Sequence, residues 1–340
     1  MLVAKYAGRK AVRIVEQPSP PPPSPGEVQL EVSYVGICGT DLHILHGAMD
    51  GRVSMPLAFG HEVSGTVTAV GAGVAGWAPG DQACIFPLLP DGSCDACIRG
   101  FGHICVNLDF IGIDSPGGLQ QLWNVPEGTL VRVPDSIDLR DAALIEPVAV
   151  AVHDVRRAGV SAGASVVVLG GGPIGVLIAS VARSIGARVA VAELEPSRRQ
   201  TIVDLGLNAA AAGDDLPSWV NEWTGGAGAD FVFEVSGSAG GVLQSASLAR
   251  VRGTVVIVAI HPRPREVDLH RVFWRELTVI GTRVYERDDF DRAIELMDEG
   301  AIPTEVITHV FPLHQIGDAL DTLESGAAMK VLVAVAGKES

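Results

Sequence analysis

The sequence lacks an excess of positive charge. It holds 25 lysines and arginines against 40 aspartates and glutamates, which gives a formal net charge of −15 at pH 7. Such an acidic chain repels a phosphate backbone, so we expect no nucleic-acid partner. The composition is otherwise that of a globular protein, with 47% hydrophobic residues and 40 glycines. A length of 340 residues predicts about two domains.

The chain also lacks an unbroken membrane span and the layout of an export signal. Residues 164–182 carry no charge, but glycines and a proline interrupt them between 170 and 175. A strand, a turn and a helix fit that pattern better than one spanning helix. Residues 1–6 show no signal-peptide arrangement. We therefore expect a soluble, cytoplasmic protein without a membrane partner.

Cysteine is scarce, odd in number and clustered. The five cysteines are Cys38, Cys84, Cys94, Cys97 and Cys105. A disulfide framework would pair and spread them, whereas a cluster in a chain without an export signal indicates metal binding. In the cluster, Asp91 and the last three cysteines can surround one zinc ion as a structural site. The alternative is a loop that contains reduced cysteines and no metal.

Two patterns of secondary structure divide the chain. Short β-branched stretches at 12–15, 28–32, 67–70 and 83–86 alternate with glycine or proline turns, which predicts a small β-barrel or sandwich. A helix is expected over 138–158. From residue 163, apolar strands at 165–169, 188–192, 230–234, 253–259 and 277–280 alternate with helical segments. This alternation predicts an α/β fold with a doubly wound parallel sheet.

A glycine-rich turn follows the first of these apolar strands and opens a helix. Its residues are Gly170, Gly172, Pro173, Ile174 and Gly175. In that context the motif predicts a dinucleotide site, because the turn lets backbone N–H groups reach a pyrophosphate at the helix N-terminus. The alternative is a glycine turn without a ligand.

The acidic residue that this motif requires is Glu193, which lies 21 residues beyond Gly172 at the end of the second strand. Its carboxylate would accept hydrogen bonds from the ribose hydroxyls and repel a 2′-phosphate, which favours NAD over NADP. Arg198 and Arg199 oppose that preference, because a phosphate could recruit them.

A second group of metal-ligating residue types lies earlier in the chain. Cys38, His61 and Glu62 offer a thiolate, an imidazole and a carboxylate. A catalytic zinc site needs three protein ligands and one open position, and the ion lowers the pKa of a bound hydroxyl. Thr40 and His43 are close in sequence and could carry the released proton, with His46 as a further candidate.

Together these motifs resemble the zinc-dependent medium-chain alcohol dehydrogenases, in particular the branch of polyol, butanediol and threonine dehydrogenases. The resemblance covers essentially the whole chain and rests on residues 36–43, 60–62, 91–105, 145–151 and 170–175. It implies a GroES-like β-barrel catalytic domain formed by 1–150 and 287–340. It also implies a Rossmann NAD-binding domain at 151–286.

The resemblance assigns roles to individual residues. It implies that Cys38, His61 and Glu146 hold catalytic zinc, Glu146 standing where many relatives have a second cysteine. Glu62 is the acidic neighbour that enters or leaves the coordination shell, and Thr40 and His43 form a proton relay. Cofactor-lining positions are Val235, Ser236, Ile260 and Thr282.

Two departures from the family pattern stand out. Asp91 replaces a cysteine that most relatives have in the structural zinc site, and a carboxylate binds zinc more weakly than a thiolate. Residues 119–123 replace the Ala-Glu-Tyr text that is common beside the catalytic cleft of relatives. The first departure bears on zinc occupancy and the second on substrate choice.

The predicted function is zinc-dependent hydride transfer from a secondary alcohol to NAD. The substrate is a small polyol, vicinal diol or threonine-like molecule, and the enzyme a homodimer or homotetramer joined at the edge of the nucleotide-domain sheet. The alternatives are a zinc-free medium-chain reductase, a short-chain dehydrogenase and a nucleotide-binding regulatory protein without turnover. The joint presence of Cys38, His61 and Glu146 argues against the first.

Overall fold

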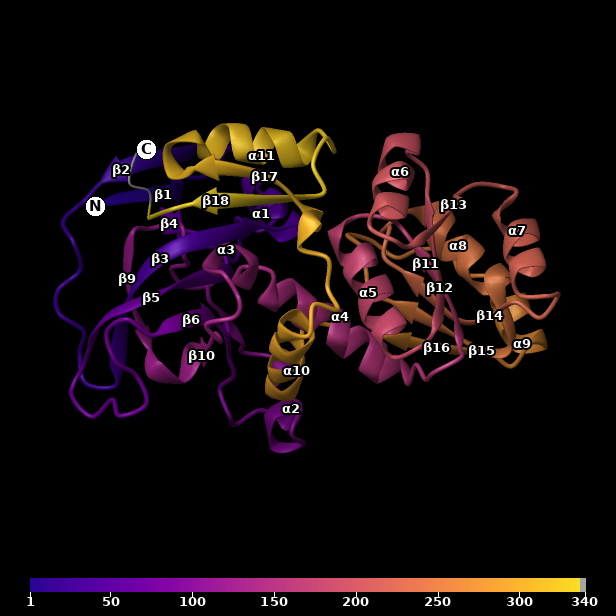
Figure 1. The fold of residues 1–340 in the computed structure, drawn as a ribbon, viewed down its shortest axis with the longest axis horizontal. Coiled ribbons are helices and arrows are strands. Elements are labelled where there is room, and N and C mark those ends of the chain that lie inside the picture. Colours follow the sequence, from indigo (N-terminus) through magenta and orange to yellow (C-terminus); the bar gives the residue numbers. More distant parts are fainter. Residues whose placement is uncertain (337–340) are drawn as a thin grey trace. The chain divides into compact units, whose positions relative to one another are not determined.

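The computed structural model describes residues 1–336, and the chain divides into two compact units. The first unit combines Met1–Glu146 with the chain from Val306 onward, and the second is Pro147–Glu305 (Figure 1). A β-rich unit built from both ends of the chain and a central α/β unit match the expected fold class.

Helix α10 (Arg287–Asp298) belongs to the second unit, whose last residue is Glu305. The reason is a buried cluster on α4 (Ile145–Ala158). Asp289 of α10 accepts hydrogen bonds from His153 Nδ1 at 2.8 Å and from Arg156 Nε at 2.6 Å.

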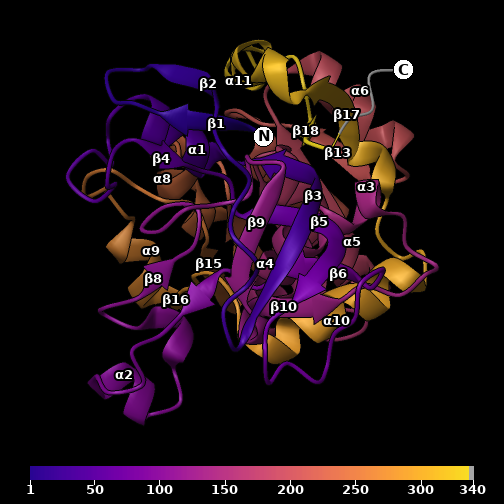
Figure 2. The same cartoon turned by 90° about the vertical axis from the view of Figure 1, so that its left-hand side faces the viewer.

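The first unit is dominated by a seven-stranded sheet with the order β10-β6-β5-β3-β18-β17 and with β9 paired to β3. Its strands are β3 (Glu27–Ile37), β5 (Glu62–Val70), β6 (Gln82–Ile85), β9 (Leu122–Pro126), β10 (Leu130–Arg132), β17 (Ile307–Pro312) and β18 (Lys330–Ala334). Figure 2 shows β3, β5, β6 and β9 crossing this unit. Residues 27–33 of the long strand β3 alternate buried and less buried positions, as a strand with one face on the core must, and the strand ends in three consecutive buried residues.

Smaller elements complete the first unit. They are β1 (Leu2–Tyr6), β2 (Val12–Glu16) and β4 (Leu57–Ala58) in one sheet, β7 (Leu88–Leu89) and β8 (Asp109–Phe110) in another, and the helices α1 (Gly39–Leu45), α2 (Asp95–Ile98), α3 (Leu139–Ala142) and α11 (Ile316–Glu324). The helix expected over 138–158 is two helices, α3 and α4. Pro147 has no N–H to bond the carbonyl of residue 143, so one continuous helix cannot form there.

The second unit is built on a six-stranded sheet in which every strand pair is parallel. The strand order is β13-β12-β11-β14-β15-β16, which is that of a doubly wound dinucleotide fold. The strands are β11 (Ser165–Leu169), β12 (Arg188–Glu193), β13 (Asn208–Ala211), β14 (Ala229–Glu234), β15 (Ala249–Ile257) and β16 (Thr278–Gly281). The crossover helices are α5 (Pro173–Ser184), α6 (Pro196–Asp204), α7 (Leu216–Trp223), α8 (Ala239–Leu248) and α9 (Leu269–Trp274).

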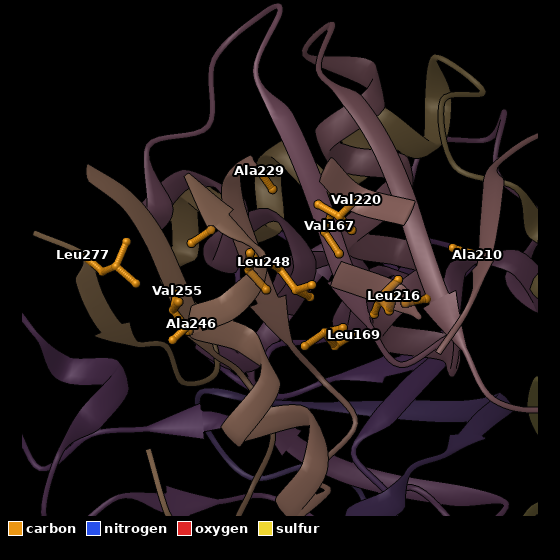
Figure 3. Packing of buried hydrophobic residues seen from close by; sticks show 13 residues of the cluster. Val167, Leu169, Ala210, Leu216, Val220, Ala229, Ala246, Leu248, Val255 and Leu277 are labelled. Carbon is orange, nitrogen blue, oxygen red and sulfur yellow. The ribbon is translucent and has the colours of Figure 1, made fainter. Parts of the chain in front are cut away.

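A continuous apolar cluster joins this sheet to its helices (Figure 3). Val167 of β11 and Val255 of β15 pack with Leu216 of α7 and Leu248 of α8, and all four are buried. Burial on both faces explains why β11 has five consecutive buried residues and no alternation. The packed sheet therefore provides a rigid base for the loops at its strand ends. No helix in the described range is long and apolar enough to cross a membrane.

Candidate metal centres and cofactor-binding loops

Helix α1 begins directly after Cys38 and presents the predicted relay residues. The sequence did not indicate this helix, which is held at its start by Asp41: the Cys38 N–H donates to Asp41 Oδ2 at 2.8 Å. A carboxylate in the first turn also stabilises the helix, because it lies at the positive end of the helix dipole. Thr40 and His43 lie three residues apart on α1, and therefore on neighbouring positions of one helix face.

Strand pairing assembles the first metal cluster. Cys38 follows the end of β3, and β3 pairs with β5 so that Gly36 lies opposite Glu62. One ligand atom each from Cys38, His61 and Glu62 lies within 4.8 Å of the other two. Gly36 is required here, because a Cβ at that position would lie 1.9 Å from Glu62 Oε2. The three residue types suit zinc, and two of them are buried.

The electrostatics of His61 are those of a cation site. Burial lowers the pKa of His61, but contact with Cys38 and the charges of Asp41 and Glu146 outweigh burial and raise it to about 10. Neutral imidazole is the form that binds metal, and a divalent ion would take the place of the extra proton. The negative surroundings of His61 therefore fit a bound cation.

Asp41 is a residue whose role the sequence analysis missed. It is 1% exposed, burial raises its pKa, and its Oδ1 lies 3.9 Å from His61 Nδ1. That separation is too long for a hydrogen bond, but it places a carboxylate behind the imidazole. Outer carboxylates of this kind orient metal-ligating histidines. The signal in the sequence was an acidic residue three positions after Cys38, at the start of a helix.

Lys330 is the second residue that was missed. Its ammonium group is buried, forms an ion pair with Glu62 Oε2, and donates to the Ile37 carbonyl at 3.1 Å. Burial lowers the pKa of Lys330, but the charges of Glu62, Cys38 and Glu146 outweigh it and raise the pKa. The first residue of β18 thus fixes the carboxylate whose role in coordination the resemblance left open.

Glu146 is the outer member of the metal group. It lies in the first turn of α4, is 5% exposed, and its charge acts on both His61 and Lys330. Its carboxylate is not among the atoms that lie within 4.8 Å of one another. The structure therefore brings Glu146 near the cluster, with Cys38, His61 and Glu62 as the compact inner set.

The predicted relay begins beside the cysteine. Cys38 Sγ lies 3.7 Å from Thr40 Oγ1, and His43 is exposed one helical turn farther on. His46 instead binds Glu324 Oε1 at 2.8 Å. This arrangement favours Thr40 and His43 over His46.

The second cluster lies in the loop around α2 and 3₁₀ helix η1 (Gly102–Ile104). Ligand atoms of Asp91, Cys94, Cys97 and Cys105 all lie within 4.8 Å of one another. Burial and the neighbouring sulfurs raise the pKa of Cys97 to about 12. Crowded thiols of this kind fit a cation that would bind them as thiolates.

Asp91 also supports the turn that carries the thiols. Its Oδ1 accepts from the N–H groups of Ser93 and Cys94 at 2.8 and 3.0 Å, and its Oδ2 accepts from Asn107 Nδ2 at 2.6 Å. These hydrogen bonds, with that from Asn107 as the largest cause, lower the pKa of Asp91. Asp91 is thus held in place by the loop, with lone pairs left for a metal.

The glycine turn has the geometry that a phosphate-binding loop needs. Gly170 has φ 108°, and a Cβ on Gly175 would lie 2.0 Å from the Gly170 carbonyl oxygen. Gly172 is the N-cap and Pro173 the first residue of α5. The twelve-residue helix therefore points its positive end at this turn, next to its unpaired N–H groups.

Glu193 lies directly behind the glycine turn. It is 7% exposed, accepts from the N–H groups of Gly171 and Glu195 at 2.8 and 2.9 Å, and lies 3.7 Å from Arg198 Nη1. The carboxylate expected to meet the ribose thus also braces the phosphate loop. The guanidinium of Arg198, which was predicted to lie near the adenosine ribose, lies beside the Glu193 carboxylate.

The remaining predicted cofactor positions meet at one edge of the sheet. Val235, Ser236, Ile260 and Thr282 follow the carboxyl ends of the adjacent strands β14, β15 and β16. The Thr282 N–H donates to the Ile257 carbonyl at 3.1 Å, and a Cβ on Gly237 would lie 3.9 Å from the Ile260 carbonyl oxygen. Ligands of doubly wound sheets bind at this edge.

Comparisons with known proteins agree with these features. Residues 24–135 match the alcohol dehydrogenase GroES-like domain, and residues 173–299 match the zinc-binding dehydrogenase model. The chain is 47% identical to 2-dehydro-3-deoxy-L-galactonate 5-dehydrogenase of Pseudoalteromonas atlantica, with 98% of each chain covered. It is 32% identical to L-galactonate-5-dehydrogenase of Escherichia coli, over 88% of this chain and 89% of the relative.

Among solved structures, a Sinorhizobium meliloti dehydrogenase bound to NADP superimposes with a TM-score of 0.91 at 30% identity, covering 98% of both chains. Sequence similarity, fold and the two cysteine-containing clusters agree. The chain therefore belongs to the zinc-binding medium-chain alcohol dehydrogenases, within the group that contains the polyol dehydrogenases.

Proposed function

We propose that this protein oxidises a secondary hydroxyl of a small polyhydroxylated acid, with NAD as hydride acceptor. The observation that carries the proposal is the Cys38–His61–Glu62 cluster, two of whose residues are buried, in a chain that also has a dinucleotide-binding glycine turn. The two curated relatives named above are dehydrogenases of galactonate-type acids, which supports a sugar acid over a simple alcohol.

Cys38, His61 and Glu146 would hold the zinc ion, and Glu62, which is paired with Lys330, would be the acidic neighbour that enters or leaves the coordination shell. When bound, the ion supplies Lewis acidity, which lowers the pKa of the substrate hydroxyl. Asp41 Oδ1 faces the Nδ1 side of the His61 imidazole at 3.9 Å, and Nε2 would then bind the metal. Asp91, Cys94, Cys97 and Cys105 would hold a second, structural zinc.

The chain's own groups then carry the proton away. The Thr40 hydroxyl, next to Cys38, would accept the substrate proton and pass one to His43. His43 is exposed and can release that proton to water. A hydroxyl can both donate and accept, so threonine is suited to the middle of such a relay.

The cofactor would place its pyrophosphate on the N–H groups at the start of α5 and its adenosine ribose on Glu193. A 2′-phosphate would face the carboxylate of Glu193, whereas Arg198, 3.7 Å from that carboxylate, is the cation that a 2′-phosphate would recruit. We expect Glu193→Ala to weaken NAD binding more than NADP binding. Equal weakening in a fluorescence titration would remove Glu193 from this role.

Assembly through the edge of the nucleotide-binding sheet is also part of the proposal. Strand β16 is the last strand of that sheet, and its Val279 is 45% exposed. Leu269, Phe273 and Trp274 on α9 are 69–73% exposed, an apolar surface that a second copy would cover. Trp274→Glu should yield monomers in analytical ultracentrifugation, and an unchanged sedimentation coefficient would contradict this interface.

The direct test of the activity is NADH production from a panel of sugar acids, polyols and vicinal diols, measured together with zinc content. Turnover with zinc present supports the proposal. A protein that binds NADH but turns over no member of the panel would instead fit a nucleotide-binding regulatory protein. Thiolate ligands call for a reducing compartment, so we propose a cytoplasmic location.

A further inference from the structure

The turn that follows β8 in the first unit lies directly against the segment that carries His61. A Cβ on Gly112 would lie 2.6 Å from the Gly60 carbonyl oxygen and 3.2 Å from the backbone nitrogen of His61. A Cβ on Gly117 would lie 2.2 Å from the same oxygen, to which the Gly118 N–H donates at 2.9 Å. Backbone meets backbone here, with no room for a side chain. A displacement of the turn is therefore transmitted to His61.

Phe110, the last residue of β8, contacts the imidazole itself. The centroids of the Phe110 and His61 rings lie 5.2 Å apart, and the ring planes meet edge to face at 69°. Phe110 is 8% exposed and His61 is 2% exposed, so both rings are enclosed. Aromatic rings attract each other in this geometry. Phe110 therefore restricts the rotation of the imidazole, and this rotation decides where its two nitrogens point.

Asp114 closes the turn behind Phe110. Its Oδ2 accepts from the Phe110 N–H at 2.8 Å, and its own N–H donates to the Phe110 carbonyl at 2.9 Å. The Ile113 N–H donates to the same carbonyl at 2.9 Å. These reciprocal hydrogen bonds tie the backbone of Phe110 to the position of the Asp114 carboxylate.

Arg52 holds that carboxylate from a separate loop, which follows α1. Its Nε and Nη2 donate to the two oxygens of Asp114 at 2.5 and 2.6 Å, the two-point geometry that fixes direction as well as distance. The loop is itself anchored, because the Arg52 N–H donates to the Met49 carbonyl at 2.8 Å and Asp50 accepts from the Tyr6 hydroxyl at 2.7 Å. The side chains of the pair are 39% and 21% exposed. Exposed ion pairs contribute little to overall stability, so we expect this pair to act on the position of the turn.

We infer that Arg52 and Asp114 are positioning residues for the metal ligand His61. The contacts run from the guanidinium through the carboxylate and Phe110 to the imidazole, and all of them lie within the first unit. Loss of an outer partner of a metal ligand lowers metal affinity by about 10–100-fold. This pair lies one contact farther out, so removing it should lower the metal affinity of the Cys38–His61–Glu62 cluster about three- to tenfold.

The inference rests on the metal site of the proposed function, so its test measures metal binding and does not depend on turnover. The wild type is compared with Arg52→Gln, Asp114→Asn, the double variant and Arg52→Lys. Arg132→Gln is the matched control, because Arg132 of β10 pairs with Asp81 in the same unit at 2.9 Å. Cobalt(II) replaces zinc, since its visible absorption depends on the identity and geometry of its ligands. The cysteine loop contributes equally to every variant, so difference spectra report the first cluster.

Arg52→Gln and Asp114→Asn should each shift the cobalt absorption and weaken metal binding, while the melting temperature and NADH affinity stay near those of the wild type. The double variant should be no worse than either single variant, because both remove the same contact. Arg52→Lys keeps the charge without the two-point geometry, so it should fall between wild type and Arg52→Gln. Arg132→Gln should match the wild type.

Three results would overturn the inference. The first is an unchanged cobalt spectrum and metal affinity in both single variants. The second is an equal change in Arg132→Gln, which would make the effect a general one. The third is a wild type whose first cluster binds no metal. A wild type that binds metal there but oxidises no alcohol would instead contradict the proposed function, and the spectra would still decide the role of Arg52 and Asp114.

Discussion

The two metal clusters of the first unit are built in opposite ways. The Cys38–His61–Glu62 cluster draws on strands and a helix that lie far apart in sequence, and a buried lysine from near the end of the chain completes it. The Asp91–Cys105 cluster is made within one loop. Strand pairing and the buried ion pair with Lys330 position the first cluster. Hydrogen bonds within one loop position the second cluster. Perturbing each should therefore affect different properties of the protein.

The largest expected effect is the loss of enzymatic turnover when the Cys38–His61–Glu62 cluster loses a ligand. Cys38→Ser should lower kcat by more than the roughly 10–100-fold that loss of an outer-shell partner costs, because it removes a ligand. NADH affinity should remain, since the glycine turn belongs to the other unit. Steady-state kinetics and fluorescence titration measure the two properties. Full activity in this variant would remove Cys38 from the metal site.

The next largest effect is expected from breaking the buried ion pair between Lys330 and Glu62. Lys330→Met leaves the Glu62 carboxylate buried without its partner, which typically costs about 3–5 kcal/mol of unfolding free energy. Adding Glu62→Gln should recover much of this loss, because the charge that needed a partner is gone. Denaturant unfolding of the two single variants and the double variant measures the coupling. Strictly additive losses would mean that the pair is not coupled.

Among residues 1–336, the buried carboxyl of Asp154 has no lysine or arginine partner, in contrast to Glu62. Asp154 of α4 is 0% exposed, and burial raises its pKa to about 7, against the opposing effects of Thr282 and His153. Because the pKa is higher in the folded state, the stability contribution of Asp154 falls as pH rises from about 4 to about 7. Asp154→Asn should therefore match wild type near pH 4 and exceed its melting temperature at pH 8. A constant difference at both pH values would contradict this titration.

The smallest effect is expected from the local cluster. Asp91→Ala should lower the zinc content from two ions per chain toward one and destabilise only the loop, because the three sulfurs remain but Ser93, Cys94 and Asn107 lose their acceptor. Metal analysis and thermal melting measure both quantities. Zinc content of one in the wild type, unchanged in Asp91→Ala, would show that the loop holds no metal. Turnover should change little, which distinguishes this loop from the first cluster.

The predicted residues of each contiguous group lie close together in the structure. The glycine turn, Glu193 and the cysteine loop each lie within a short stretch whose spacing restricts the geometry, and the structure brings each group together. The fold class followed from the two patterns of periodicity and is confirmed by the sheets.

Sequence reasoning missed site residues whose contacts depend on pairing between strands that are distant in sequence. Lys330 meets Glu62 only because β18 pairs with β3, with Val331 opposite Ile37. Four of the five residues of β18 are buried, so their pattern does not select a register or a partner strand. Asp41 escaped notice for a different reason: the short helix that begins at Gly39 was not recognised. The split between α3 and α4 could have been expected, because Pro147 lacks the N–H that would bond the carbonyl of residue 143.

The central claim is that Cys38 contributes the only sulfur to a zinc ion held otherwise by nitrogen and oxygen. It can be tested by zinc X-ray absorption spectroscopy on a Cys94→Ser, Cys97→Ser variant, in which the loop can no longer compete for the metal. The account predicts about one zinc per chain with one sulfur and the remaining ligands nitrogen or oxygen. A variant without zinc, or zinc with no sulfur ligand, would contradict it.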